Sequence, residues 1–354
     1  MITTMPRRAL LGALPSLAGL AVLAGCGDAG SGAATADATA AVGGGGGAGP
    51  TDAFPVTVEH QYGRTVVPSE PRRVVSVGLT EQDVLLELGV VPVGVTEWYA
   101  EQPSAVWPWA RGLLGEARPT VLSQEDGFSF EAVAALAPDL IVGTNAGMDE
   151  QDWATFSAIA PTVTSLTGSD RYSAPWRDQT RQIARALGRS AAGEALIAGV
   201  EEHYAAARAA NPGFAGRTAT FTQGAPWDNN LYVYPDGVNT DFLTELGFRI
   251  TPGLEAYAEQ EGQQALISGE RTDLLDADVV VVAAESAENI PVLLDFGTMR
   301  TLDAVRGGRT VFADDVLSGA VYFLTPLSQK YVVDRLVPHL AAALAGDSPQ
   351  AVVG

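Results

Sequence analysis

Residues 73–95 read RVVSVGLTEQDVLLELGVVPVGV, and this stretch sets the expected fold. The apolar run at 73–77 predicts a buried strand. Thr80 is a suitable N-cap for the helix that follows, with Asp83 in the place of the capping-box acid. Apolar residues then recur on one helical face until Gly89, a typical helix stop. A second Val-rich strand comes next. Strand, helix and strand in this order are typical of an α/β fold with a largely parallel sheet.

The second half of the chain repeats this pattern. A strand is predicted at 218–221, and a helix is predicted to begin near Thr240. That helix ends in LTELGF at 243–248, which matches LLELGV at 85–90. The match places an apolar helix face and a glycine stop at the same point of each half.

A second echo lies further along each half. Glu131 and Glu270 each open a predicted helix, and in each case an Asp that begins an apolar strand follows eight residues later, at Asp139 and at Asp278. Because the two echoes occur in the same order, we predict two similar α/β lobes with mostly parallel sheets.

The stretch between the halves carries helical periodicity and no strand pattern. One helix is predicted from Pro175 to Leu187 with a stop at Gly188, and Ser190 is placed to cap a second helix at 191–210. A helix of about 20 residues spans about 30 Å, so we expect a rigid connection between the lobes. The predicted segments are a signal peptide at 1–25, a tether at 26–53, an N lobe at 54–174, connecting helices at 175–211, a C lobe at 212–346 and a tail at 347–354.

The N-terminal segment carries an export pattern. Arg7 and Arg8, a short apolar run and small residues before Cys26 are typical of a signal peptide. The sequence LAGC at 23–26 resembles the lipobox of bacterial lipoproteins. The resemblance implies cleavage before Cys26, a lipid on its thiol and a position on the extracytoplasmic side of the cell membrane. An ordinary secreted protein with one free thiol is the alternative, and the twin arginines leave a second export route open.

Composition narrows the range of partners. Cys26 is the only cysteine, so no disulfide can form within one chain and stability must come from a hydrophobic core. The Gly- and Ala-rich segment after Cys26 predicts a flexible tether. The formal net charge of −21 repels the phosphates of nucleic acids. We expect a monomer with no nucleic-acid partner.

Four short motifs in a fixed order carry a family resemblance. They are GRTVVP at 63–68, PRRVV at 71–75, LGVVPVGV at 88–95 and LAPDLIV at 136–142. With the connecting helix and the lipobox, they resemble the periplasmic binding proteins of iron–siderophore and vitamin B12 ABC importers. The resemblance implies two α/β lobes joined by one long helix, a ligand cleft between the lobes, and no chemistry performed on the ligand.

The resemblance also implies a role for Glu131 and Glu270. In this family, one Glu near a helix start in each lobe docks onto Arg residues of the permease. An acid in the first turn of a helix is stabilised by the helix dipole, and a carboxylate pairs well with a guanidinium group. The alternative is that both are ordinary helix-start charges.

Candidate ligand-binding residues follow the strands of both halves, because ligands of open α/β sheets bind beyond the carboxyl ends of the strands. They are Trp98, Tyr99, Phe128, Asn145, Arg171, Trp227, Glu285 and Tyr322. Aromatic rings offer a bulky ligand large apolar faces, although any one of them can equally serve ordinary packing. Trp107, Trp109 and Trp153 are predicted to be packing residues.

Charge favours one ligand class. Arg171 is the only basic residue among the candidates, whereas Glu97 and Glu285 are acidic. Aromatic rings with acids suit a neutral or cationic ferric hydroxamate siderophore better than an anionic catecholate or citrate complex. Iron is expected only as part of the bound complex, without a cofactor of the protein itself. Haem or a corrinoid is the alternative ligand for the same fold.

Other classes of protein find less support. The three histidines, His60, His203 and His339, are far apart in sequence, so a direct zinc or manganese binder is not expected. No Gly-x-Ser-x-Gly, His-Glu-x-x-His or phosphate-loop motif is present. An exported enzyme with scattered active-site residues and an adhesive lipoprotein stay open as rival classes.

Overall fold

The computed structural model describes residues 52–354 except 170, 173 and 261. The predicted signal peptide, most of the tether and Cys26 lie outside the described residues. Within the described part of the chain, no helix combines the length and the hydropathy that a membrane span needs.

The N lobe is built on a five-stranded sheet in the order β5-β4-β3-β6-β7, with every strand parallel to its neighbours. The strands are β3 (Val74–Ser76), β4 (Gly94–Thr96), β5 (Thr120–Leu122), β6 (Leu140–Gly143) and β7 (Thr162–Thr164). Its helices are α1 (Glu81–Glu87), α2 (Arg111–Leu114), α3 (Phe130–Ala135) and α4 (Glu150–Ser157), with a short 3₁₀ turn at Pro103–Ala105. An antiparallel hairpin, β1 (Val56–His60) and β2 (Gly63–Val67), precedes them. The strand order reverses between β3 and β6, so a topological switch point lies there.

The C lobe is built on a seven-stranded sheet in the order β11-β9-β8-β12-β13-β14, with β10 beside β8. The strands are β8 (Thr218–Trp227), β9 (Asn230–Tyr234), β10 (Arg249–Ile250), β11 (Ala265–Ser268), β12 (Val279–Glu285), β13 (Thr310–Asp314) and β14 (Val352–Val353). Its α-helices are α7 (Asp241–Thr244), α8 (Asn289–Leu294), α9 (Asp303–Arg306), α10 (Asp315–Phe323) and α11 (Pro326–Leu344). Strand β9 is antiparallel to both neighbours, and the β8/β12 boundary is the switch point of this sheet.

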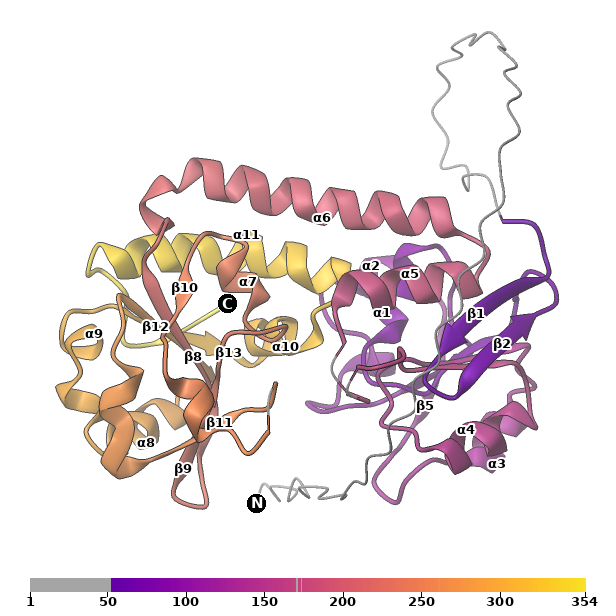
Figure 1. The fold of residues 1–354 in the computed structure, drawn as a ribbon, viewed down its shortest axis with the longest axis horizontal. Helices are drawn as coiled ribbons and strands as arrows, with labels where there is room; N and C mark the ends of the chain where they lie inside the picture. The colour runs from indigo at the N-terminus through magenta and orange to yellow at the C-terminus, as the bar shows by residue number, and fades with distance from the viewer. Residues whose placement is uncertain (1–51, 170, 173, 261) are drawn as a thin grey trace, which may run out of the picture. The chain divides into compact units, whose positions relative to one another are not determined.

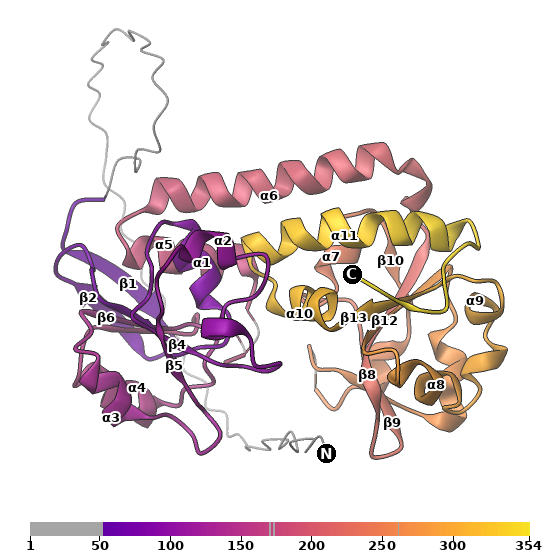
Figure 2. The same cartoon turned by 180° about the vertical axis from the view of Figure 1, so that it is seen from behind.

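Two helices join the lobes. Helix α5 (Trp176–Ala186) ends before Gly188, whose φ of +67° suits glycine, and α6 (Ser190–Ala210) follows. Figures 1 and 2 show α6 running across both lobes, with α11 alongside it. Leu196 of α6 packs on the N-lobe core, whereas Ile197 and Val200 belong to the C-lobe core. One helix therefore contributes to two cores, and the expected fold of two α/β lobes joined by a long helix is confirmed.

The repeated Asp residues have matching structural roles. The carboxylate of Asp139 accepts hydrogen bonds from the backbone N–H groups of Arg72 and Arg73, at 2.8 Å from each nitrogen at the closest, just before β3. The carboxylate of Asp278 accepts from the backbone N–H of Thr218 at 2.8 Å, where β8 begins. Each Asp thus fixes the start of the first strand of its lobe's main sheet, which explains the same residue at the same place in both halves.

Two expected helix caps differ from the structure. Thr80 precedes α1 but makes no side-chain cap, and its backbone N–H donates to Glu81 rather than to Asp83, whose carboxylate accepts from Trp109 and Thr325 instead. Ser190 is the first residue of α6 rather than its cap, and its hydroxyl donates to Asp52 at 2.6 Å. In both cases a side chain that was expected to cap its own helix instead forms a hydrogen bond with a residue distant in sequence.

Three segments of the C lobe also differ. Strand β8 extends to Trp227 and forms a hairpin with β9 around Asp228 and Asn229, whose φ values are 47° and 58°. Residues predicted to follow this strand in a loop are therefore part of the hairpin. The predicted tail contains β14, which pairs with β13. The helix expected at Glu270 is a kinked 3₁₀ segment, Gly269–Leu275.

Candidate functional site

Six aromatic residues meet where the two lobes touch, and we call them the interlobe aromatic cluster. The N lobe contributes four of them and α10 of the C lobe contributes two: Trp98, Tyr99, Trp107, Trp109, Tyr322 and Phe323. The ring centroid of Trp98 lies 6.2 Å from that of Tyr322 and 5.4 Å from that of Phe323. Tyr99 lies 6.2 Å from Tyr322. Residues predicted from opposite halves of the sequence therefore come together here.

The cluster has a rigid, buried base. Trp107 is 2% exposed and stacks on Trp109 with the ring planes 14° apart. Helix α10 approaches this stack through Gly319, where an added Cβ would lie 2.4 Å from the indole ring of Trp107. Only glycine permits this approach without a shift of the ring or of the helix. The prediction that Trp107 and Trp109 serve packing agrees with these contacts.

An acid joins the cluster from the switch point of the C-lobe sheet. Glu285 is the last residue of β12 and has a φ of 65°, which a side-chain-bearing residue adopts only under strain. Its carboxylate accepts a hydrogen bond from the hydroxyl of Tyr322 at 3.3 Å. Of the predicted ligand residues, the structure thus links Trp98, Tyr99, Tyr322 and Glu285 in one contiguous group.

Two other candidates lie deeper in the N lobe. Asn145 follows β6 and is largely buried, with its side-chain amide donating to the hydroxyl of Thr80 at 3.1 Å. Phe128 packs on Phe130 and Phe156, with ring centroids 6.0 and 5.2 Å away. Phe128 therefore belongs to the border of the N-lobe core, and its role as a ligand residue stays a prediction.

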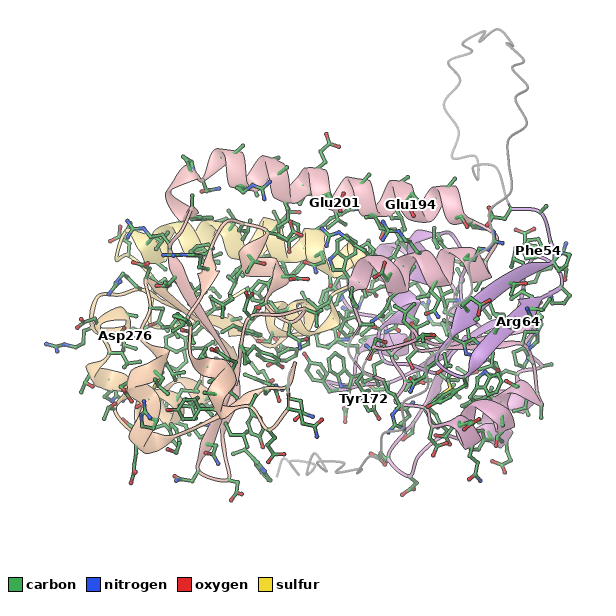
Figure 3. All side chains as sticks on the ribbon, in the orientation of Figure 1. Phe54, Arg64, Tyr172, Glu194, Glu201 and Asp276 are labelled. Carbon is green, nitrogen blue, oxygen red and sulfur yellow. The ribbon has the colours of Figure 1, made fainter. Side chains whose placement is uncertain are left out.

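Trp227 and Arg171 occupy more open positions. Trp227 is 55% exposed at the tip of the β8–β9 hairpin. Arg171 is exposed, and its positive charge acts on Tyr62 and Asp152, where it opposes the rise in pKa that burial causes in both groups. The one predicted basic ligand residue is therefore engaged with N-lobe groups. Its neighbour Tyr172 lies on the side of the N lobe that faces the C lobe (Figure 3).

A buried acid holds the switch point of the N lobe. The carboxylate of Glu81 accepts from the backbone N–H of Asn145 at 2.6 Å and of Thr80 at 3.1 Å, and from the hydroxyl of Thr144 at 3.3 Å. Burial raises the pKa of Glu81, and these hydrogen bonds oppose that rise. An added Cβ on Gly78 would lie 2.0 Å from the Glu81 carboxylate, so a glycine is needed beneath it. Glu81 is not among the residues predicted from the sequence, where its one signal is an acid directly after the strand and turn.

A second buried acid, Asp83, links the lobes. One of its oxygens, Oδ2, accepts from the indole Nε1 of Trp109 at 2.7 Å and from the hydroxyl of Thr325 at 2.6 Å. Burial raises the pKa of Asp83 to about 7. One turn further along α1, Glu87 pairs with Lys330 of α11 at 2.8 Å. The α1–α11 contact is thus polar as well as apolar.

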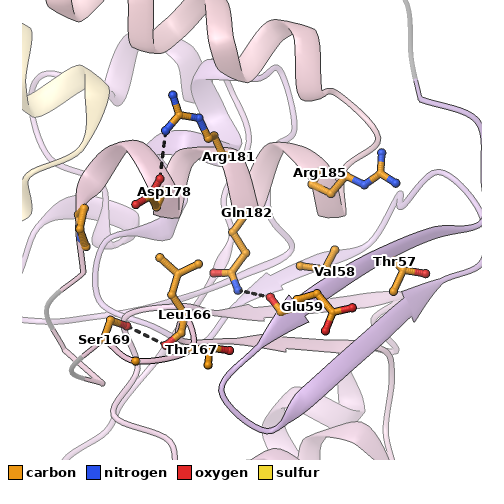
Figure 4. A pocket seen from close by; sticks show the side chains of 12 residues that line it. Thr57, Val58, Glu59, Leu166, Thr167, Ser169, Asp178, Arg181, Gln182 and Arg185 are labelled. Carbon is orange, nitrogen blue, oxygen red and sulfur yellow. Dashed lines mark hydrogen bonds and ion pairs between the residues drawn. The ribbon is translucent and has the colours of Figure 1, made fainter. Parts of the chain in front are cut away.

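An open pocket of about 600 Å³ lies away from the aromatic cluster. It sits in the N lobe between β1, the loop after β7 and α5, and holds none of the predicted ligand residues (Figure 4). Its Arg181 is already paired with Asp178 at 3.0 Å and with Glu194 at 2.8 Å. The guanidinium of Arg181 therefore already has two carboxylate partners within the protein.

The predicted docking acids are on the surface. Glu131 is exposed in the first turn of α3, and Glu270 is exposed at the start of the 3₁₀ segment. Within the described residues, no group of three or more His, Cys, Asp or Glu side chains is arranged to hold a metal ion.

Comparisons with known proteins agree with this architecture. Residues 74–317 match the periplasmic binding protein family. The probable siderophore-binding lipoprotein YfiY of Bacillus subtilis (strain 168) is 27% identical over 276 residues, which cover 74% of this chain and 81% of that protein. A periplasmic solute binding protein of Mycobacterium smegmatis is 40% identical, with a TM-score of 0.76 over 82% of this chain and 98% of that one. PiaA of Streptococcus pneumoniae, solved with ferrichrome, shares the fold at 24% identity and a TM-score of 0.69, over 82% of this chain and 99% of that one.

This chain belongs to the periplasmic binding protein family. The resemblance to binding lipoproteins of the ferric siderophore type is confirmed by the same comparisons. Its relatives are substrate-binding proteins rather than enzymes, so the protein is assigned to the substrate-binding class and the exported-enzyme alternative is set aside.

Proposed function

We propose that this protein captures a ferric siderophore outside the cytoplasm and delivers it to an ABC permease. The observation that carries the proposal is the interlobe aromatic cluster, in which rings from both lobes meet beside the Tyr322–Glu285 pair. A bulky ligand that rests on Trp98 and Tyr322 touches both lobes at once. The names of YfiY and of the PiaA–ferrichrome complex support the same ligand class.

Charge supports a neutral or cationic siderophore complex. Glu285 belongs to the group of linked residues, and Glu97 lies half-buried just before Trp98. Burial first, and then the nearby charge of Glu101, raise the pKa of Glu97, so an anionic ligand at this point would meet two neighbouring acids. Arg171 is engaged with Tyr62 and Asp152. A ferric hydroxamate complex avoids the repulsion that an anionic citrate or tris-catecholate complex would meet.

Iron arrives in this proposal as part of the ligand, so the protein needs no metal ligands of its own. Glu131 and Glu270 are proposed as the two docking points for permease arginines.

The lipid on Cys26 is proposed as the anchor that keeps the protein at the extracytoplasmic face of the membrane. Replacing Cys26 by Ser should release the protein from the membrane fraction, and unchanged retention would contradict the anchor.

Tryptophan emission titrated with a ligand panel tests the ligand class. The panel is ferrichrome, ferrioxamine B, ferric citrate, a ferric tris-catecholate, haem and cobalamin. We expect quenching and the tightest binding with the two hydroxamates. A clear preference for an anionic complex would contradict the charge argument, and selective binding of haem or cobalamin would replace the siderophore assignment.

Variants of two tryptophans test the aromatic site. Loss of a ring that stacks on the ligand costs on the order of 1–3 kcal/mol by analogy with stacking on nucleobases, or roughly five- to 150-fold in Kd. Trp98→Ala and Trp227→Ala should therefore both weaken ferrichrome binding. Trp153→Phe is the control, because Trp153 lies in the N lobe with its indole N–H donating to the Thr162 carbonyl at 3.1 Å. Full affinity in both alanine variants would refute an aromatic clamp.

A further inference from the structure

Asp83 is a buried acid that joins three parts of the molecule. It lies on α1 of the N lobe with 0% exposure. Its Oδ2 accepts from Thr325, the N-cap of α11 in the C lobe, at 2.6 Å, and from the indole of Trp109 at 2.7 Å. One carboxylate oxygen therefore ties the C lobe, the N lobe and the aromatic cluster together.

Thr325 is joined directly to the end of α10, so a movement of Thr325 moves α10 as well. It caps α11 through reciprocal bonds with Ser328, at 3.1 Å from the Ser328 backbone nitrogen and 2.9 Å from its hydroxyl. Only Leu324, with φ 52° and ψ 37°, separates Thr325 from the last residue of α10. Tyr322 and Phe323 are the last two residues of α10. A shift of Thr325 is thus transmitted through one constrained corner to the two C-lobe rings of the cluster.

The other face of the contact is close-packed. Trp109, which donates to Asp83, stacks on Trp107 with ring centroids 5.1 Å apart. Trp107 in turn touches α10 at Gly319. Phe323 lies 5.3 Å from Trp109. Both hydrogen-bond donors to Asp83 are therefore connected by direct packing to rings of the proposed ligand site.

The charged surroundings of Asp83 are few. Glu87 on the same helix repels it and is itself paired with Lys330 of α11 at 2.8 Å. Charged side chains on the other helices next to α1 have partners elsewhere: Arg111 of α2 bonds Gln102 and the Val106 carbonyl, and Arg177 of α5 pairs with Glu201 and Glu245. Among the described residues, no group donates to Oδ1 of Asp83.

We propose that Asp83 is a positioning residue of the ligand site, which holds Tyr322 and Phe323 against Trp98 and Trp109 through its hydrogen bond with Thr325. The proposal rests on the proposed function, because the rings it positions are those of the siderophore site. In this proposal, α1 and α11 set the spacing between the two halves of the site. Neither helix carries a predicted ligand residue.

The protonation state of Asp83 gives this role a measurable signature. In the closed contact the carboxyl is buried and its pKa is about 7. Where the contact parts and water enters, the pKa returns toward about 4, the ordinary value for Asp. Protonation therefore favours the closed contact, and ligand binding to the assembled cluster should tighten several-fold as the pH falls from about 8.5 to about 5.5. Asn at this position keeps an oxygen acceptor for both donors and removes the titration.

The binding experiment uses ferrichrome, a neutral ferric trihydroxamate, with wild type and four variants at several pH values between about 5.5 and about 8.5. Thr325→Val loses the donor to Asp83 and should bind about tenfold more weakly. Thr325→Ser keeps the hydroxyl and should bind like wild type. Asp83→Asn should bind as tightly as wild type at low pH and show no pH dependence. Asp241→Asn is the matched control, since Asp241 is another acid whose pKa burial raises, to about 6, on α7 and outside the contact; it should keep the wild-type profile.

A second measurement needs no ligand. Because Trp109 donates to Asp83, tryptophan emission should titrate near pH 7 in wild type and in Asp241→Asn, and this step should disappear in Asp83→Asn and in Trp109→Phe. Wild-type ferrichrome affinity that does not vary with pH, or full affinity in Thr325→Val, overturns the proposal. If no siderophore binds at any pH, the proposed function fails. The emission measurement then tests the Asp83 contact by itself. A missing emission step in wild type overturns the contact between Asp83 and Trp109, whereas an observed step supports it.

Discussion

At the scale of single residues, the site depends on positions where one atom more or less decides the geometry. Gly319 is such a position, because α10 meets the Trp107 ring at a distance that leaves no room for a methyl group. Trp107 is buried, stacks on Trp109 and packs at a tilt against Tyr99, so a shift of its ring would disturb both neighbours. The contact between the lobes is therefore set by a missing side chain as much as by those present.

Gly319→Ala should destabilise the protein by about 1–3 kcal/mol, the usual range for an overpacked interior, and should also weaken siderophore binding. Urea unfolding and a Kd for ferrichrome measure the two effects. Gly112→Ala in α2 is the control, since an added Cβ there meets nothing within 4 Å. An unchanged unfolding midpoint for Gly319→Ala would show that α10 can withdraw from Trp107 at no cost.

Asp83 makes stability depend on pH in a direction that follows from its pKa. The folded-state pKa is raised from 3.8 to about 7, so the unfolded chain carries the charge more easily. The free energy of unfolding should therefore fall as the pH rises from about 4 through about 7, by about 4 kcal/mol at most. Asp83→Asn should remove this loss and be the more stable protein at pH 8. Asp241 acts in the same direction with a pKa of about 6, so the comparison is made in an Asp241→Asn background. Equal pH profiles with and without Asp83→Asn would contradict the assignment.

At the scale of elements, α6 joins the lobes, and its glycines lie in two different environments. Gly193 lies against α5, where an added Cβ would be 2.5 Å from the Cβ of Ala184. Gly199, in the same helix, has only the Lys330 ammonium within reach, at 3.9 Å. The first glycine permits a close helix–helix contact, whereas the second has no packing role and only lowers helix propensity.

The pair gives a matched prediction within one helix. Gly193→Ala should cost about 1–3 kcal/mol, because it pushes α6 away from α5. Gly199→Ala should stabilise the protein by up to about 1 kcal/mol, because alanine is the better helix former. Urea unfolding of the two variants measures both. The same sign for both substitutions would contradict the packing argument.

At the scale of the whole molecule, the two lobes are variations on one plan. In each, an Asp fixes the start of the first strand, and the strand order reverses beside that strand. Asn145 follows β6 and Glu285 ends β12, so the two switch points present a buried amide in one lobe and an acid in the other. The connecting helices and the α1–α11 contact then bring aromatic residues of both lobes together in the interlobe aromatic cluster.

Transport is a property of this scale. Glu131→Ala and Glu270→Ala should leave ferrichrome affinity within about twofold of wild type, because both acids are exposed and outside the aromatic cluster. Uptake by cells that express the cognate permease should fall, most strongly in the double variant. Glu150→Ala, which removes another exposed acid from the first turn of a helix, is the control. Loss of ligand affinity in either docking variant, with the fold intact, would refute the assignment.

The amino-acid sequence by itself determined the features that repeat over short distances. The βα units, the helix stop at Gly89 and the long connecting helix follow from local periodicity and stop signals, which act within a few residues. Asp139 and Asp278 were recognisable as a repeat, although their partners are distant in sequence. The family resemblance extended these to the two-lobe plan. The class of protein was therefore predictable before any tertiary contact was known.

The tertiary structure alone decided which candidates meet. Trp98 reaches Tyr322 from the other half of the chain, whereas Phe128 turns to the N-lobe core and Arg171 to Tyr62. Asp83 was expected to cap its own helix, yet its carboxylate joins the lobes through Thr325. Such choices depend on burial and on partners far apart in sequence, and a buried carboxylate takes the donors that the fold brings to it rather than those nearest along the chain.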